Sequence, residues 1–200
     1  MGRRRREERR EKREDFAAKR SNVKRKNTLL AAGILGIIAV IIGYASYTFV
    51  TMEATGPGIP PGAGKLGDEH EHASMLVRIF GDKFDFSAST YQVKSPWIHF
   101  ESSDGETIHR HASGVTVGYL FKNLNLVINE ECFIFPPSDG RQFCTNEDYS
   151  LKYYINHRPV SDINDYVFED GDRILISYGS EIQEQIEEQL SELDSQLIIG

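Results

Sequence analysis

Five of the six histidines lie in a short stretch of the chain, and they are the side chains best suited to chemistry. They are His70, His72, His99, His109 and His111. Two pairs have the spacing His-x-His. In a strand, residues i and i+2 point to the same face about 6.5–7 Å apart, so each pair can offer two imidazoles to one ion. Neutral imidazole is a good ligand for zinc and copper, and the pattern therefore predicts a zinc or copper site.

The register of one hairpin decides how many of these histidines meet. If His99 pairs with His109, then His99, His109 and His111 share one face with Glu101 beside them. If Asp104-Gly105 instead forms a two-residue turn, His99 falls on the opposite face, because a slip of one residue exchanges the faces. Both registers are open from the sequence. The earlier His-x-His pair either adds secondary ligands or belongs to a flexible linker.

Cys132 and Cys144 are the only cysteines. Pairing Phe135 with Arg141 across the intervening Pro-Pro-Ser-Asp-Gly turn sets the two cysteines opposite each other in a hairpin. Outside the cytoplasm such a pair persists as a disulfide. A dithiol oxidoreductase normally uses Cys-x-x-Cys at a helix start. The spacing here therefore predicts a structural bridge.

An apolar run without charged side chains places these residues relative to a membrane. Residues 28–52 are long enough to cross a bilayer as one helix, which needs about 20 apolar residues. Residues 1–27 form a basic arm, and basic residues beside a span stay in the cytoplasm. We expect an uncleaved anchor in the cell membrane, with the N-terminus cytoplasmic and residues 53–200 extracytoplasmic. A cleaved signal peptide is the alternative, although its apolar region is usually shorter.

The basic arm and the rest of the chain carry opposite charge. Residues 1–26 hold 13 of the 23 Lys and Arg, although the whole chain has a net charge of −7. Such an arm is attracted to anionic lipid. We therefore expect the lipid bilayer as its partner, and no nucleic acid.

The remainder divides by composition. Residues 53–68 are rich in glycine and proline, which predicts a linker. Residues 69–179 suffice for one small core and read mainly as short strands, with a helix at 117–124 capped by Thr116. The order of hairpin, helix and three further strands predicts an α+β, β-grasp-like and mainly antiparallel ectodomain.

Residues 180–200 form an acidic amphipathic helix in this prediction. An apolar residue recurs every three or four positions and forms one stripe: Ile182, Ile186, Leu190, Leu193 and Leu197. The stripe either packs on its own domain or binds a partner through residues 181–197, by self-association or with another membrane protein.

The last strands resemble those of the ubiquitin-like sulfur-carrier families. The motifs are Asn156-His157-Arg158-Pro159-Val160, which corresponds to an Asn-Gly-x-x-Val turn, and Asp170-Gly171-Asp172 before the final strand. The resemblance implies a β-grasp fold. The carrier function is not expected, because it requires a terminal Gly-Gly.

Residues 28–125 resemble an uncharacterised family of microbial single-pass membrane proteins. The motifs are HxHA, here His70-Glu71-His72-Ala73, and IHxHxxG, here Ile108 to Gly114. The family often has a further His-x-His downstream, where this chain has Thr116-Val117-Gly118. Its members are sometimes labelled protein-disulfide isomerase, and the resemblance implies no established activity.

These features favour a membrane-anchored extracytoplasmic module that binds zinc or copper for metal capture, delivery or sensing. A non-catalytic scaffold or accessory subunit of a membrane complex is the alternative. A thiol–disulfide oxidoreductase or isomerase is the third hypothesis. The sequence has no recognisable nucleophile motif or nucleotide loop, so we assign no catalytic residue.

Overall fold

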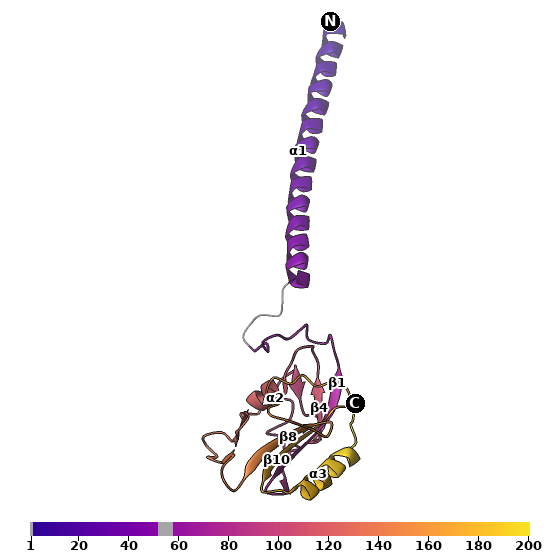
Figure 1. The fold of residues 1–200 in the computed structure, drawn as a ribbon. Coiled ribbons are helices and arrows are strands. Elements are labelled where there is room, and N and C mark those ends of the chain that lie inside the picture. Colours follow the sequence, from indigo (N-terminus) through magenta and orange to yellow (C-terminus); the bar gives the residue numbers. More distant parts are fainter. Residues whose placement is uncertain (1, 52–57) are drawn as a thin grey trace. The chain divides into compact units, whose positions relative to one another are not determined.

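The structure is a computed structural model that describes residues 2–51 and 58–200, and the chain divides into two compact units (Figure 1). The first unit contains the single helix α1 (Gly2–Thr51). Its segment Lys24–Thr48 is long and apolar enough to cross a membrane, and a signal sequence near an N-terminus has the same properties. The predicted apolar helix is therefore present, and the basic arm continues the same helix.

The predicted linker falls partly outside the described residues, which resume at Gly58. Its second half is attached to the folded unit that follows. The Gly64 N–H donates to the Ser113 carbonyl oxygen over 2.9 Å, and the Ser113 N–H donates to the Asp68 carboxylate over 2.8 Å. Ile59 also packs against the core. These contacts fix the segment that leads into the first strand.

The second unit is built on a seven-stranded sheet with the order β3-β4-β1-β10-β8-β9, and β2 also pairs with β1. The strands are β1 (Glu71–Ile79), β2 (Asp82–Lys83), β3 (Ile98–His99), β4 (Thr107–Arg110), β8 (Ser150–Ile155), β9 (Arg158–Val160) and β10 (Arg173–Gly179). β1 and β10 run parallel, and the other paired strands are antiparallel. The mixed and mainly antiparallel α+β class agrees with the prediction.

A helix and a small sheet are inserted between β4 and β8. The helix is α2 (Val117–Asn123), and the antiparallel sheet contains β5 (Val127–Ile128), β6 (Cys132–Ile134) and β7 (Gln142–Cys144). The Thr116 side chain caps α2 as predicted, because its Oγ1 accepts a hydrogen bond from the Tyr119 N–H over 3.2 Å.

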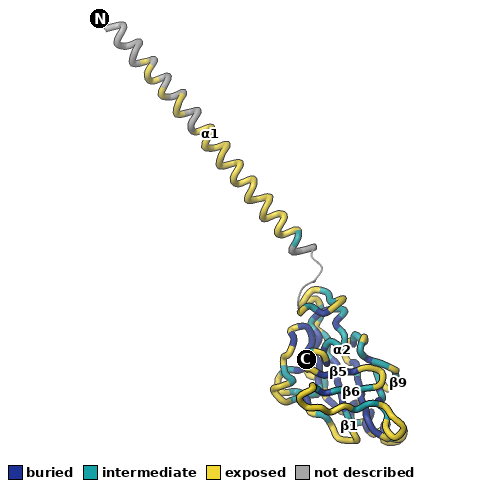
Figure 2. Tube along the Cα trace, turned by 90° about the vertical axis from the view of Figure 1, so that its left-hand side faces the viewer, coloured by how far each residue is buried: buried dark blue, intermediate teal, exposed yellow. Residues whose placement is uncertain are grey.

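Alternation along the strands divides the apolar side chains between two layers. One face of the main sheet, which includes Met75 and Ile174, packs against α2 and the small sheet in the main core. The other face, which includes Leu76 and Leu175, is covered by α3 (Gln183–Ser195). The buried stretches of the strands are dark blue in Figure 2. The sheet is thus covered on both faces, and α3 supplies the second layer.

The predicted apolar stripe of the C-terminal helix is used in part for this packing. Ile186, Leu190 and Leu193 are buried against the sheet, whereas Ile182 and Leu197 are exposed at the two ends. The centre of the stripe therefore packs against the sheet of the same folded unit, which is one of the two alternatives that the sequence left open.

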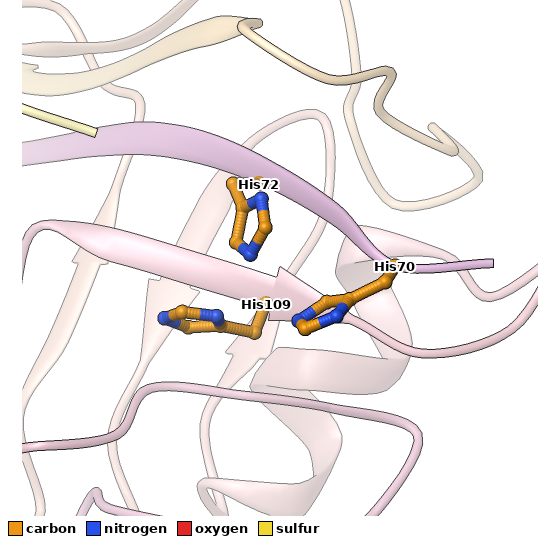
Figure 3. A group of neighbouring side chains, drawn as sticks. All are labelled: His70, His72 and His109. Carbon is orange, nitrogen blue, oxygen red and sulfur yellow. The ribbon is translucent and has the colours of Figure 1, made fainter. Parts of the chain in front are cut away.

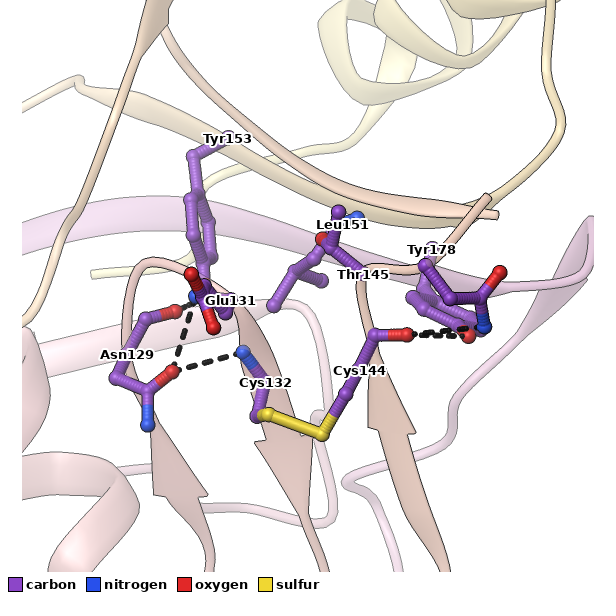
Figure 4. Close-up of a disulfide and its surroundings, with 9 residues drawn as sticks. Asn129, Glu131, Cys132, Cys144, Thr145, Leu151, Tyr153 and Tyr178 are labelled. Carbon is purple, nitrogen blue, oxygen red and sulfur yellow. Dashed lines mark hydrogen bonds between the residues drawn. A yellow bond between two sulfur atoms is a disulfide. The ribbon is translucent and has the colours of Figure 1, made fainter. Parts of the chain in front are cut away.

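Cys132 and Cys144 form a disulfide between β6 and β7, directly opposite each other as the sequence predicts. Hydrogen bonds hold both of its ends (Figure 4). The Cys132 N–H donates to Asn129 Oδ1 over 2.8 Å, and the Tyr178 hydroxyl donates to the Cys144 carbonyl oxygen over 3.0 Å. The bridge thus joins β6 to β7, and the hydrogen bond from Tyr178 connects the small sheet to β10.

Replacing both cysteines by serine should lower the free energy of unfolding by about 2–3 kcal/mol, because the bridge closes a loop with a sequence separation of 12. Urea denaturation followed by the fluorescence of the single tryptophan, Trp97, measures the change. Wild-type protein treated with reductant should show the same loss. Equal stability of the variant and the oxidised wild type would contradict a structural role.

Candidate metal centre

The histidines meet at one end of the sheet, where β3, β4 and β1 lie side by side. His99 of β3 pairs with His109 of β4, and His109 pairs with His72 of β1. Neighbouring strands are about 4.8 Å apart, so the three imidazoles stand in a row on one face. The register that joins His99 to His109 is therefore correct, and the alternative with a two-residue turn is wrong.

His70 and His111 lie beside this row on the same face, because His70 is two residues from His72 and His111 is two residues from His109. We call these five imidazoles the histidine cluster. Each of them lies next to two others, so the five together form a ring. Ring centroids are separated by 4.6 Å for His70–His72, 4.9 Å for His72–His109, 6.0 Å for His109–His99, 5.0 Å for His99–His111 and 4.6 Å for His111–His70. The structure therefore brings together all five residues that the sequence proposes as ligands.

Three members of the cluster are close enough to share one ion. His70, His72 and His109 each offer a ring nitrogen, and these three atoms all lie within 4.8 Å of one another. Figure 3 shows the three rings converging between β1 and β4. They differ in exposure, since His70 is exposed and His109 is buried. A metal ion held here would have one side open to solvent.

Asp170 fixes the orientation of His72. Its Oδ1 accepts from the His72 backbone N–H over 3.0 Å and lies 3.3 Å from the ring Nδ1. A carboxylate oxygen accepts hydrogen bonds, so Nδ1 carries the proton and Nε2 keeps its lone pair. Nε2 is buried and has no hydrogen-bond partner within the described part of the chain. In Figure 3 it points toward His109, which makes it available as a ligand atom.

His109 is the most buried member of the cluster, with 5% of its surface exposed. Burial lowers the pKa of His109 to about 4, and it also lowers the pKa of His111. Both rings are therefore neutral near pH 7, which is the form that binds metal. Among the described residues, His109 Nδ1 has no hydrogen-bond partner. It is a second buried nitrogen whose lone pair or proton is unsatisfied.

His99 and Glu101 form the opposite end of the cluster. His99 Nδ1 donates to the Ser95 carbonyl oxygen over 2.6 Å, because a carbonyl oxygen only accepts. His99 Nε2 lies 3.2 Å from Glu101 Oε2, and the hydrogen bond from His99 lowers the pKa of Glu101. This hydrogen bond requires a proton on Nε2 as well, because the Nδ1 proton is already donated to the Ser95 carbonyl oxygen. A cation between the two atoms, either a proton or a metal ion, makes the contact favourable.

Arg110 stands between two members of the cluster in the sequence and points away from them. It is 3% exposed, and Nε and Nη2 donate to the Phe168 carbonyl oxygen over 3.2 and 2.9 Å. Nη1 donates to the Ala112 carbonyl oxygen over 2.7 Å and pairs with Glu69. Arg110 therefore connects β4 to the residue before His70 and to the loop before β10, and it positions two sides of the cluster.

The segment after α3 approaches the cluster along the same face of the sheet. The Ser74 hydroxyl donates to Gln196 Oε1 over 2.5 Å, and the Ile199 N–H donates to Thr107 Oγ1 over 3.2 Å. At Gly200 an added Cβ atom would lie 2.8 Å from the His72 ring. This segment therefore limits access to His72 from the side of α3.

The metal-free protein should lose stability as the pH falls from about 6.5 to 4. The folded pKa of His109 is about 4 and its ordinary value is about 6.5, so the unfolded chain binds more protons in this window. The loss attributable to His109 is up to about 3 kcal/mol. Urea denaturation in chelator at a series of pH values measures it. A His109→Gln variant should show a flatter profile, and identical profiles would contradict the assignment.

Sequence spacing identified the imidazoles and Glu101 but missed the residues that orient them. Asp170 lies 98 residues from His72, and only the pairing of β1 with β10 brings it there, so no local signal could reveal it. Ser95 acts through a carbonyl group, which every residue has. Arg110 did carry a signal, because strand alternation places it on the face opposite His109 and His111, and a buried charge on that face requires partners.

The chain was compared with protein-family models, with curated proteins and with solved structures, and no match was found. The family resemblances that the sequence suggests therefore gain no support from these comparisons. What this cluster can do follows from its donor atoms, distances and burial alone.

Proposed function

We propose that the protein is a membrane-anchored metal-binding module whose folded unit holds zinc or copper outside the cytoplasm, for capture, delivery or sensing of the metal. One observation carries the proposal. His72 Nε2 and His109 Nδ1 are buried and lack a hydrogen-bond partner in the described residues, and both belong to the group of three histidines whose ligand atoms converge.

Burial without a partner is unfavourable for a ring nitrogen. An unsatisfied buried polar group costs about 1–3 kcal/mol, and this fold has two in one cluster. A metal ion would satisfy both at once. The low pKa of His109 supports the same role, because the ring need not lose a proton before it binds.

The groups around the cluster also resemble those that orient metal ligands. A ligating histidine usually donates its second ring N–H to a carboxylate or a backbone carbonyl. His72 does so toward Asp170, and His99 does so toward the Ser95 carbonyl oxygen. Three histidines leave a fourth position of a tetrahedral ion open, which permits ligand exchange in delivery or sensing.

The remaining features fit this role. The apolar segment Lys24–Thr48 supports the anchor, and the basic residues before it support a cytoplasmic N-terminus. The central parallel pair of β1 and β10, flanked by antiparallel strands, supports a β-grasp arrangement for the folded unit. The disulfide agrees with an oxidising compartment.

The test is a metal titration of the full chain purified in mild detergent and stripped with chelator. We expect tight, stoichiometric binding of Zn²⁺ or Cu²⁺, measured by calorimetry and by metal content after desalting. Affinity no higher than that of scattered surface histidines would refute the proposal. The scaffold hypothesis would then take its place, with the exposed Ile182 and Leu197 at the ends of α3 as the contact candidates.

Replacing Asp170 by asparagine should weaken metal binding by about 10–100-fold, because ligand-orienting partners contribute that much to affinity. The change removes the charge that holds the proton on His72 Nδ1 and leaves the size of the side chain unchanged. Asp165→Asn is the matched control and should bind like the wild type. Competition with a chromophoric chelator measures both. Equal affinities of the two variants would show that Asp170 does not act on the site.

A further inference from the structure

We propose that the histidine cluster holds two metal ions, with the Glu101 carboxylate as the bridge between them. This inference rests on the proposed metal-binding function and specifies its stoichiometry. The first ion lies among His70, His72 and His109, and the second between His99 and His111.

The number and spacing of the imidazoles exceed what one ion uses. A zinc ion takes four ligands in structural sites and three protein ligands in catalytic sites. Two imidazoles on one tetrahedral ion have ring centroids about 5 Å apart, because each Zn–N bond is about 2.0–2.1 Å long. His99 and His111 match this value at 5.0 Å. Neither belongs to the group of His70, His72 and His109, whose ligand atoms lie within 4.8 Å of one another, so the pair can hold an ion of its own.

Each group also has its own orienting partner. Asp170 holds His72 at one end of the cluster, and the Ser95 carbonyl oxygen holds His99 at the other. In both cases Nδ1 makes the orienting hydrogen bond, so Nε2 is the ring nitrogen left to bind a metal ion. The two ends of the cluster, on β1 and on β3, thus each contain a histidine that is oriented for metal binding.

Glu101 lies where a bridging ligand is required. Its Oε2 is 3.2 Å from His99 Nε2, and its Oε1 is 3.9 Å from His109 Nδ1. The two oxygens thus face nitrogens of different groups. A carboxylate that binds one ion through each oxygen suits a two-metal centre, in which the ions are about 3.5–4 Å apart.

The full chain in detergent, stripped of metal and loaded with Zn²⁺, gives the stoichiometry after desalting by elemental analysis. We expect two ions in the wild type and one in the His99→Ala/His111→Ala variant. Loading with Cu²⁺ provides a second readout, because two neighbouring Cu²⁺ ions give a spin-coupled paramagnetic resonance spectrum. Glu101→Gln should remove that coupling, and circular dichroism checks that each variant is folded.

The outcomes separate this inference from the proposed function. One ion in the wild type would overturn the two-ion centre and leave metal binding in place. Two ions in both the wild type and the His99→Ala/His111→Ala variant would also overturn it, because the second ion would then lie elsewhere. A wild type that binds no metal would overturn both proposals.

Discussion

Replacing both His72 and His109 by alanine should lower the affinity for Zn²⁺ at least about 1000-fold. The two residues supply the buried nitrogens of the three-histidine group. Loss of a group that only orients a ligand already lowers the metal affinity by about 10–100-fold. Loss of two ligands should therefore lower the affinity further. Competition with a chromophoric chelator measures affinity over this range.

The matched control for this experiment is His157→Ala. His157 lies outside the cluster, in the turn between β8 and β9, where its Nε2 contacts Asp194 at 3.0 Å. The control should therefore keep wild-type affinity. A similar loss in both variants would mean that binding depends on histidine content and not on the cluster.

Replacing Arg110 by methionine should lower the free energy of unfolding by about 3–4 kcal/mol. The methionine retains apolar bulk but leaves the carbonyl oxygens of Phe168 and Ala112 without the guanidinium donor. Buried acceptors that lose a charged donor cost about 1–3 kcal/mol each, and removing one partner of a buried ion pair costs about 3–5 kcal/mol. Because Glu69 is partly exposed, we expect the lower part of that range. Urea denaturation of the metal-free protein measures the change.

Lys83→Met is the control for the loss of a positive charge. Lys83 pairs with Glu106 on a partly exposed surface, and such pairs contribute less than about 1 kcal/mol. If both variants lose the same small amount, the hydrogen bonds of Arg110 are not a major source of stability. The Arg110 variant should in addition bind metal more weakly, because β4 and the segment before His70 lose their common anchor.

The sequence by itself determined the local features of this protein. The apolar run predicted the N-terminal helix, because the length of such a run is a property of consecutive residues. Thr116 predicted the start of α2, and the spacing around a turn predicted the disulfide. Alternation of period two placed each His-x-His pair on one face. In each case the physical cause acts within a few residues of the chain.

Only the tertiary structure decided how these pieces combine. The hairpin register was open because either turn satisfied the local pattern, and the packing of the sheet selected the pairing of His99 with His109. His72 joined them because β1 lies beside β4. Asp170 reached His72 through the parallel pairing of β1 with β10, and α3 covered Leu76 and Leu175 on the same face. Contacts between distant segments depend on the burial of apolar surface by the whole domain, which no short stretch of sequence encodes.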